Sequence, residues 1–145
     1  MDRFLMRISI GYPGRQAERE LLKRPASREA LNDVSCCIGP ADVERIQSAV
    51  DRVHASDALL EYLQDIIDFT RKEPLFMNGL SPRAGLSLLQ ASRAWAFIDG
   101  RDHVLPEDIQ QVLPWVVSHR LRSAKNYSEI PVQQLLEIFK IVSIP

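Results

Sequence analysis

The fold is decided by the stretch GLSPRAGLSLLQASRAWAFIDGRDHVLPEDIQQV, which runs from Gly79 to Val112. Ser81-Pro82 places a capping hydroxyl before a proline, an order typical of a helix start. Asp99-Gly100 is typical of a helix end. Between these two points, apolar residues recur at three- and four-residue steps, namely Leu88, Ala91, Trp95 and Ile98. The stretch therefore predicts a helix with one buried apolar face, followed by a tight turn.

Pro106-Glu107-Asp108 opens the next helix, in which the predicted buried residues are Ile109, Val112, Leu113, Val116 and Val117. Leu105 stands where a capping side chain would be expected, so this helix start lacks one. Pro114 lies inside the helix and should bend or break it, because proline has no backbone donor. In the preceding turn, we expect Arg101 to pair with Asp102 or Glu107.

Two further helices are predicted upstream and one downstream. The first begins at Pro40 and buries Val43, Ile46, Val50 and Val53. The second is capped by Ser56, runs to about Lys72 and buries Leu59, Leu63, Ile66 and Ile67. A shorter last helix runs from Ser128 or Pro131 to about Ile141. Together these segments predict a compact bundle of four to five helices.

The N-terminal part of the sequence is different. Residues Phe4–Ile10 alternate and contain β-branched side chains, which predicts a single strand. A short charged helix is expected over Arg15–Lys23, followed by a connecting loop. A lone strand leaves its backbone groups unpaired. We therefore expect Phe4–Ile10 either to pair with a second copy of the chain or to fold back on the bundle.

Composition limits the function classes. The chain has 145 residues, and its 18 basic and 19 acidic side chains give a net charge of −1, which does not favour nucleic-acid or membrane-surface binding. No apolar run reaches the length of a membrane span, and no signal peptide is recognisable. Cys36 and Cys37 are adjacent and lack CxxC spacing, so we expect buried or half-buried thiols in a reducing, cytoplasmic compartment.

Several kinds of catalytic motif are absent from the sequence. It contains no GxxxxGK[ST] phosphate-binding loop, no GxSxG and no HExxH. His54, His103 and His119 share no ligand spacing with carboxylates or cysteines, so no metal site is expected. The residues alone thus predict an α-helical bundle without a chemistry of its own.

Four segments resemble the MoxR-type AAA+ ATPases. DRFLMRISIGYP (Asp2 to Pro13) is similar to the end of the AAA+ core, where an Asp-Arg-Phe motif leads into the last sheet strand. YLQDIIDFTR (Tyr62 to Arg71) is similar to a lid helix that ends in Thr-Arg. The stretch from Gly79 to Val112 resembles the family's sensor-2 helix and its Gly-Arg-Asp turn. SHRL (Ser118 to Leu121) resembles a His-Arg-Leu ending of the family. These segments occur in the family's order and at similar spacing, and the match is specific because Ser-Pro-Arg-Ala and Gly-Arg-Asp-x-Val-x-Pro-x-Asp-Ile occur together.

The resemblance implies an all-α AAA+ C-terminal helical lid, preceded by an orphan strand and a short helix from the end of the core. The implied domains are residues 1–25 as the end of the core, 26–38 as a linker and 39–145 as the lid. The Walker A and B motifs would lie before Met1, so we expect a fragment that is inactive alone and needs no cofactor. The parent is expected to be an ATPase that uses ATP and Mg²⁺.

As partners, the resemblance implies the AAA+ core of the same protein, neighbouring subunits of a homo-hexamer and an unknown client protein. The parent would act as a chaperone-like remodeller. No membrane partner is implied.

The resemblance also implies roles for two arginines. Arg83 matches the sensor-2 arginine, and with Ser81 and Pro82 it would form the nucleotide-binding part of the lid. Its place in a first helical turn suits this role, because backbone amides there favour an anion. Arg3 of the Asp-Arg-Phe motif matches an arginine finger that would act in trans on a neighbouring subunit's nucleotide.

Two alternatives remain open. The chain could be a free-standing helical adaptor that binds a protein through an apolar groove. It could instead be a helix-turn-helix-like DNA binder that uses Pro106 to Arg122, since His119, Arg120, Arg122 and Lys125 form a basic cluster. Charge runs are more often solvated surfaces, so we expect no nucleic acid as a partner.

Overall fold

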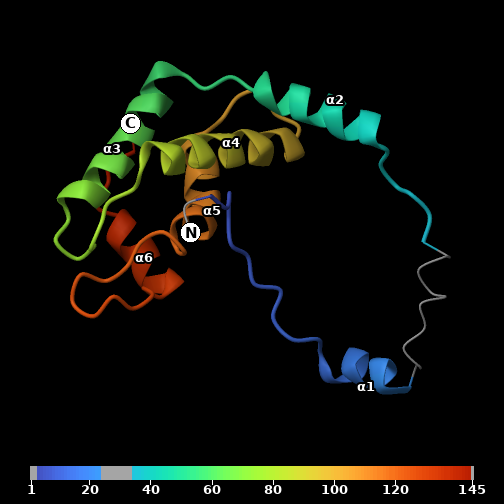
Figure 1. The fold of residues 1–145 in the computed structure, drawn as a ribbon. Coiled ribbons are helices and arrows are strands. Elements are labelled where there is room, and N and C mark those ends of the chain that lie inside the picture. Colours follow the sequence, from blue (N-terminus) through green and yellow to red (C-terminus); the bar gives the residue numbers. More distant parts are fainter. Residues whose placement is uncertain (1–2, 24–33, 145) are drawn as a thin grey trace. The chain divides into compact units, whose positions relative to one another are not determined.

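The computed structural model describes residues 3–23 and 34–144, and every helix or strand assigned in this part is an α-helix (Figure 1). In chain order these are α1 (Arg15–Lys23), α2 (Pro40–Asp51), α3 (Asp57–Lys72), α4 (Pro82–Ile98), α5 (Pro106–Val117) and α6 (Val132–Phe139). The expected all-α lid fold is confirmed. Asp2 and residues 26–33 of the expected linker lie outside the described residues.

The chain divides into two compact units. The larger consists of Met1–Arg7 with Gln47–Pro145, and the smaller of Ile8–Ile46. The smaller unit holds α1 and the start of α2, where Asp42 accepts a hydrogen bond from the Gly39 amide and pairs with Arg45. The hydrogen bond from Arg45, with that from the Gly39 backbone, holds the pKa of Asp42 below its usual value. Cys36 and Cys37, also in this unit, are exposed free thiols, so the expectation of buried thiols was wrong.

Two of the helix starts form as their sequences predict. Ser56 caps α3, where its hydroxyl accepts a hydrogen bond from the Leu59 amide at 3.2 Å. Ser81 caps α4 in the same way, accepting from the Ala84 amide at 3.1 Å. Because such caps depend only on neighbouring residues, they are readable from the sequence.

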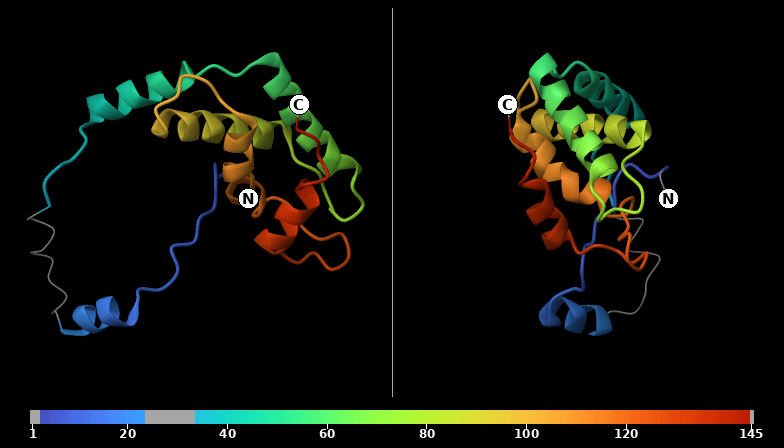
Figure 2. Two further views of the ribbon diagram at one scale, coloured as in Figure 1. Left: turned by 180° about the vertical axis from the view of Figure 1, so that it is seen from behind. Right: turned by 90° about the vertical axis from the view of Figure 1, so that its left-hand side faces the viewer.

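The core of the larger unit lies among α3, α4, α5 and α6, which stay together in both views of Figure 2. Its largest fully buried side chains include Ile66, Leu88, Ile109, Leu121 and Leu135. The most extensive contact between helices is that of α4 with α5. None of the helices in the described part of the chain has the length and apolar character needed to cross a bilayer.

The predicted buried face of α4 was partly wrong. Leu88 and Ala91 are buried, but Trp95 is 42% exposed and Ile98 is 77% exposed. Ser92 and Ala96 are fully buried in their place. Small side chains let a helix approach its neighbour closely, and apart from Leu88 the buried residues of α4 are small.

Residues Phe4–Ile10 do not form a strand. This part of the chain offers no neighbouring strand, and the segment bonds to the end of α5 instead: the Arg7 amide donates to the Trp115 carbonyl at 2.8 Å. The last carbonyls of a helix lack partners within the helix, so they are available for such a bond. Phe4–Arg7 therefore folds back on the bundle, one of the two expected outcomes.

Pro114 does not break α5, which continues through it to Val117. Proline removes one hydrogen bond of the helix. Pro114 is nevertheless buried, with Leu113 and Val116 beside it in the core cluster, and this packing holds the last turn in place.

Candidate functional site

The start of α4 presents an exposed arginine. Arg83 is the second residue of the helix and makes no ion pair or hydrogen bond with any of residues 3–23 or 34–144. Pro82 before it is also exposed, and Ser81 caps the helix. The sequence-predicted residues Ser81, Pro82 and Arg83 thus share one helix start, with a guanidinium available to an outside anion.

The end of α3 holds the loop that leads into this helix start. The Thr70 hydroxyl is buried; it donates to the Ile67 carbonyl at 2.7 Å and accepts from the Leu80 amide at 2.9 Å. Nε of Arg71 donates to the Leu80 carbonyl at 3.1 Å. Both polar groups of the Leu80 backbone are therefore held by α3. The Thr-Arg ending of this helix is visible in the sequence, which does not indicate its partners.

Gly79 fits this loop closely against α3. A Cβ added there would lie 2.6 Å from Cα and 2.8 Å from the backbone nitrogen of Arg71. Gly85, on α4, would meet only Cδ1 of Ile67, at 2.6 Å. The two glycines thus face a fixed backbone and a movable side-chain end, respectively.

We expect Gly79→Ala to lower the free energy of unfolding by about 1–3 kcal/mol, because the backbone of α3 has to shift. Gly85→Ala is the matched control and should change it little, since Ile67 can turn away and alanine favours a helix by about 1 kcal/mol. Urea denaturation of the chain measures both. Equal losses would show that the approach of Gly79 to α3 is not tight.

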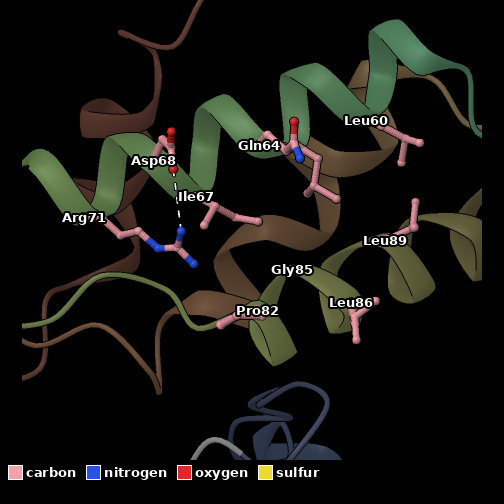
Figure 3. A pocket seen from close by; sticks show the side chains of 10 residues that line it. Leu60, Gln64, Ile67, Asp68, Arg71, Pro82, Gly85, Leu86 and Leu89 are labelled. Carbon is pink, nitrogen blue, oxygen red and sulfur yellow. Dashed lines mark ion pairs between the residues drawn. The ribbon is translucent and has the colours of Figure 1, made fainter.

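A groove of about 620 Å³ runs between α3 and α4, beside the start of α4. Figure 3 shows Arg71 reaching from α3 toward Pro82, with its ion pair to Asp68 at 3.6 Å. The groove is otherwise mainly apolar, and its lining includes Leu60, Leu63, Ile67, Leu86 and Leu89. An apolar surface therefore opens close to the exposed arginine.

The Gly-Arg-Asp turn is held by a different ion pair from the one expected. Arg101 makes two hydrogen bonds of 2.6 Å to the carboxylate of Asp108 and one of 3.0 Å to Asp99, not to Asp102 or Glu107. The Asp108 side chain is only 3% exposed and also accepts from the Leu105 amide at 2.8 Å. Asp108 thus forms one half of a capping box: from inside α5 its carboxylate accepts from the amide of the N-cap residue Leu105, which has no capping side chain of its own.

Burial and hydrogen bonding have opposite effects on the pKa of Asp108. Burial alone would raise the pKa of Asp108, but the hydrogen bonds from Arg101 and from the Leu105 backbone outweigh it and keep that pKa below its usual value. The same pairing raises the pKa of Arg101, so both groups are charged at neutral pH.

Arg3, the other predicted site residue, is exposed next to a segment that is bonded to the bundle. The Phe4 carbonyl accepts hydrogen bonds from Nη2 of Arg120 at 2.5 Å and from Nε2 of His119 at 3.3 Å. His119 is buried, and its burial lowers its pKa, which favours a neutral ring that donates from Nε2. The structure thus places Arg3 beside the end of α5.

The basic cluster expected after α5 is largely used inside the fold. Arg122 pairs with Glu129 at 3.1 Å, and Arg7 pairs with the same carboxylate at 2.7 Å. Hydrogen bonds from Arg7 and then Arg122 hold the pKa of Glu129 below its usual value. With His119 and Arg120 bonded to the Phe4 carbonyl, these side chains lend no support to a DNA-binding surface.

Among the described residues, no group of three or more His, Cys, Asp or Glu side chains is arranged to hold a metal ion. His54 and His103 lie opposite each other in a backbone bridge between their two loops.

Comparison with known proteins agrees with this arrangement. The family model described as the AAA lid domain matches residues 68–138. The uncharacterised protein YeaC of Bacillus subtilis is 31% identical over 148 residues, which cover 100% of this chain and 46% of that protein. Chaperone MoxR1 of Mycobacterium tuberculosis is 36% identical over 134 residues, covering 83% of this chain and 34% of that protein.

A solved structure of a presumed ATPase from Cytophaga hutchinsonii superimposes with a TM-score of 0.80 at 28% sequence identity. The match covers 99% of this chain and 47% of that one. Fold and family match together define an AAA lid domain. The chain belongs to the MoxR-type AAA+ ATPases, of which it carries the C-terminal lid portion. It spans less than half the length of the relatives described above.

Proposed function

We propose that this chain is the lid that closes over ATP bound by the AAA+ core of the same protein. In this proposal Arg83 is the sensor-2 residue, which contacts the terminal phosphate and couples the nucleotide state to the lid position. The observation that carries the proposal is the helix start of α4, where an exposed arginine without an ion pair among the described residues lies in the first turn, directly after the capping Ser81 and Pro82.

The chemistry of this helix start fits a phosphate. A guanidinium can donate two parallel hydrogen bonds to phosphate oxygens. The positive end of the helix dipole favours the same anion. Pro82 has no amide hydrogen and the Ala84 amide is bonded to Ser81, so the dipole and the guanidinium carry this attraction. A positive side chain is mildly unfavourable at this end of a helix when no anion is present. The bonds from Thr70 and Arg71 to Leu80 hold the helix start rigidly, which suits a residue that has to report a position.

The remaining parts of the proposal concern the whole ATPase. The nucleotide would be ATP with Mg²⁺, and the phosphate-binding loop and metal ligands would come from the core. Arg3 would serve as an arginine finger toward a neighbouring subunit in a hexamer. The protein would act in the cytoplasm as a chaperone-like remodeller of a client protein, a role supported by the name of the relative Chaperone MoxR1.

Replacing Arg83 tests the proposal. In the complete ATPase that carries this lid, Arg83→Ala should lower ATP turnover about 10–100-fold, because a charge-assisted hydrogen bond contributes about 1.5–3 kcal/mol. The lid itself should keep its stability, since the side chain is exposed.

Arg52→Ala is the matched control, because Arg52 is another exposed arginine, placed just after α2. Steady-state turnover and nucleotide affinity are measured for both variants. If Arg83→Ala and Arg52→Ala behave alike, Arg83 does not sense the nucleotide, and the adaptor alternative with its groove between α3 and α4 gains support.

A further inference from the structure

The guanidinium of Arg120 joins three parts of the larger unit. Its Nη2 donates to the Phe4 carbonyl at 2.5 Å, and its Nη1 to the Leu5 carbonyl at 3.1 Å. It also bonds to the Val116 carbonyl in the last turn of α5 and, at 3.3 Å, to the Ser87 hydroxyl on α4. A rigid, planar group with donors in fixed directions can hold several acceptors in one arrangement.

The acceptors of Arg120 lie next to the two arginines of the proposed function. Phe4 follows Arg3 directly in the chain. Ser87 is four residues after Arg83 on α4, so the two side chains lie on the same side of the helix, one turn apart. Arg120 therefore connects the segment that carries Arg3 with the first two turns of the helix that carries Arg83.

The segment is held tightly enough to transmit a displacement. Besides Arg120, its Phe4 carbonyl contacts Nε2 of His119, and the Arg7 amide donates to the Trp115 carbonyl at 2.8 Å. Met6 is half-buried and packs on the core cluster. A segment fixed at several backbone groups moves with the surface to which it is bonded.

We propose that Arg120 is a positioning residue that couples two nucleotide sites, the one of its own subunit and the one of the neighbouring subunit. The inference rests on the proposed function, in which Arg83 contacts the subunit's own nucleotide and Arg3 the neighbour's. A change in the position of Arg83 moves the turn that holds Ser87, and through Arg120 it moves the carbonyls of Phe4 and Leu5. The state of one nucleotide thereby sets the position of the finger offered to the next.

The kinetic test uses Ser87→Ala and Arg120→Lys in the complete ATPase. Ser87→Ala removes only the α4 end of the link, and Arg120→Lys keeps the charge but loses the planar fork. Both should lower kcat by about 5–10-fold with KM for ATP within about twofold, because a misplaced finger weakens only transition-state contacts.

Ser92→Ala is the matched control on the same helix, since among residues 3–23 and 34–144 the Ser92 hydroxyl bonds to the Leu88 carbonyl of α4 alone. It should leave the kcat of the wild type unchanged within about twofold. A loss of the same size in this variant would mean that α4 is merely sensitive to lost hydroxyls.

The physical test is amide hydrogen exchange of Phe4–Arg7 with and without a non-hydrolysable ATP analogue. In the wild type and in Ser92→Ala, the analogue should change the exchange rate of this segment about fivefold. In Ser87→Ala and Arg120→Lys this response should disappear although the analogue still binds. A response that persists in Ser87→Ala and Arg120→Lys, or one that is absent from the wild type, overturns the coupling.

Arg83→Ala separates the two proposals. If it abolishes the exchange response and lowers turnover while Ser87→Ala does neither, the sensor role stands and the role of Arg120 is wrong. If Arg83→Ala changes neither turnover nor exchange, the proposed function itself fails.

Discussion

In the complete ATPase, Arg3→Ala should lower ATP turnover by about 10³-fold, which is the lower end of the range of effects for an arginine finger. The structure places Arg3, exposed, beside a segment whose next carbonyls are fixed by Arg120. A finger needs such a fixed base, because the charge it stabilises on the transferred phosphoryl group exists only in the transition state. The variant should therefore lose kcat with little change in KM.

The test for action in trans is a mixing experiment. A subunit whose own nucleotide site is inactivated still carries Arg3 and can offer it to an Arg3→Ala neighbour, so mixtures should regain part of the lost activity. Arg7→Ala is the matched control on the same segment, because that guanidinium is already paired with Glu129. If mixtures regain no activity, Arg3 does not act across a subunit interface.

Asp108→Ala should destabilise the lid by about 2–4 kcal/mol, a large part of the 5–15 kcal/mol typical of a domain. The carboxylate is 3% exposed and has three hydrogen-bond donors in the fold, two from Arg101 and one from the Leu105 amide. Removing it leaves the Leu105 amide at the start of α5 without its acceptor. The Arg101 guanidinium then keeps only its ion pair with the exposed Asp99. Asp99→Ala is the control and should cost under about 0.5 kcal/mol. Similar losses in urea denaturation would contradict a special role for Asp108.

The same carboxylate makes a prediction about pH. Because the pKa of Asp108 is lower in the fold than in the unfolded chain, ionised Asp108 contributes stability above its unfolded pKa of about 3.9. That contribution is lost as the pH falls from about 5 through the folded pKa. The wild type should therefore lose stability with acid more steeply than Asp108→Ala, as denaturation curves at successive pH values would show.

Helix positions could be predicted because their signals are local. The capping hydroxyls of Ser56 and Ser81 and the proline at 106 mark helix starts through bonds and angles within one turn. The inner face of α4 could not be predicted equally well. Its periodicity favoured Trp95 and Ile98, but close packing selects residues by size as well as by hydrophobicity, and the fold buries Ser92 and Ala96.

Two of the missed features depend on partners far away in the chain. Whether Phe4–Ile10 becomes a strand depends on the presence of neighbouring strands, and a sequence pattern does not supply them. Arg120 looks like a member of a surface cluster until the fold brings the Phe4 carbonyl to it. Asp108 could have been found, because a carboxylate three residues into a helix often bonds back to the amide before it.

The bonds between Phe4 and the pair His119-Arg120 also set an order of assembly. Their partners are separated by 115 and 116 positions in the chain, so the segment beside Arg3 leaves the ribosome long before anything exists to receive it. Closing a loop of that length costs more entropy than closing the short loops between neighbouring helices. Helices α3 to α5 can fold as they are synthesised, whereas the segment can attach only after α5 is complete. The residue proposed to act on a neighbouring subunit is thus synthesised before helices α2 to α5 but is held in place only after them, so chains that end before Arg120 lack a fixed finger.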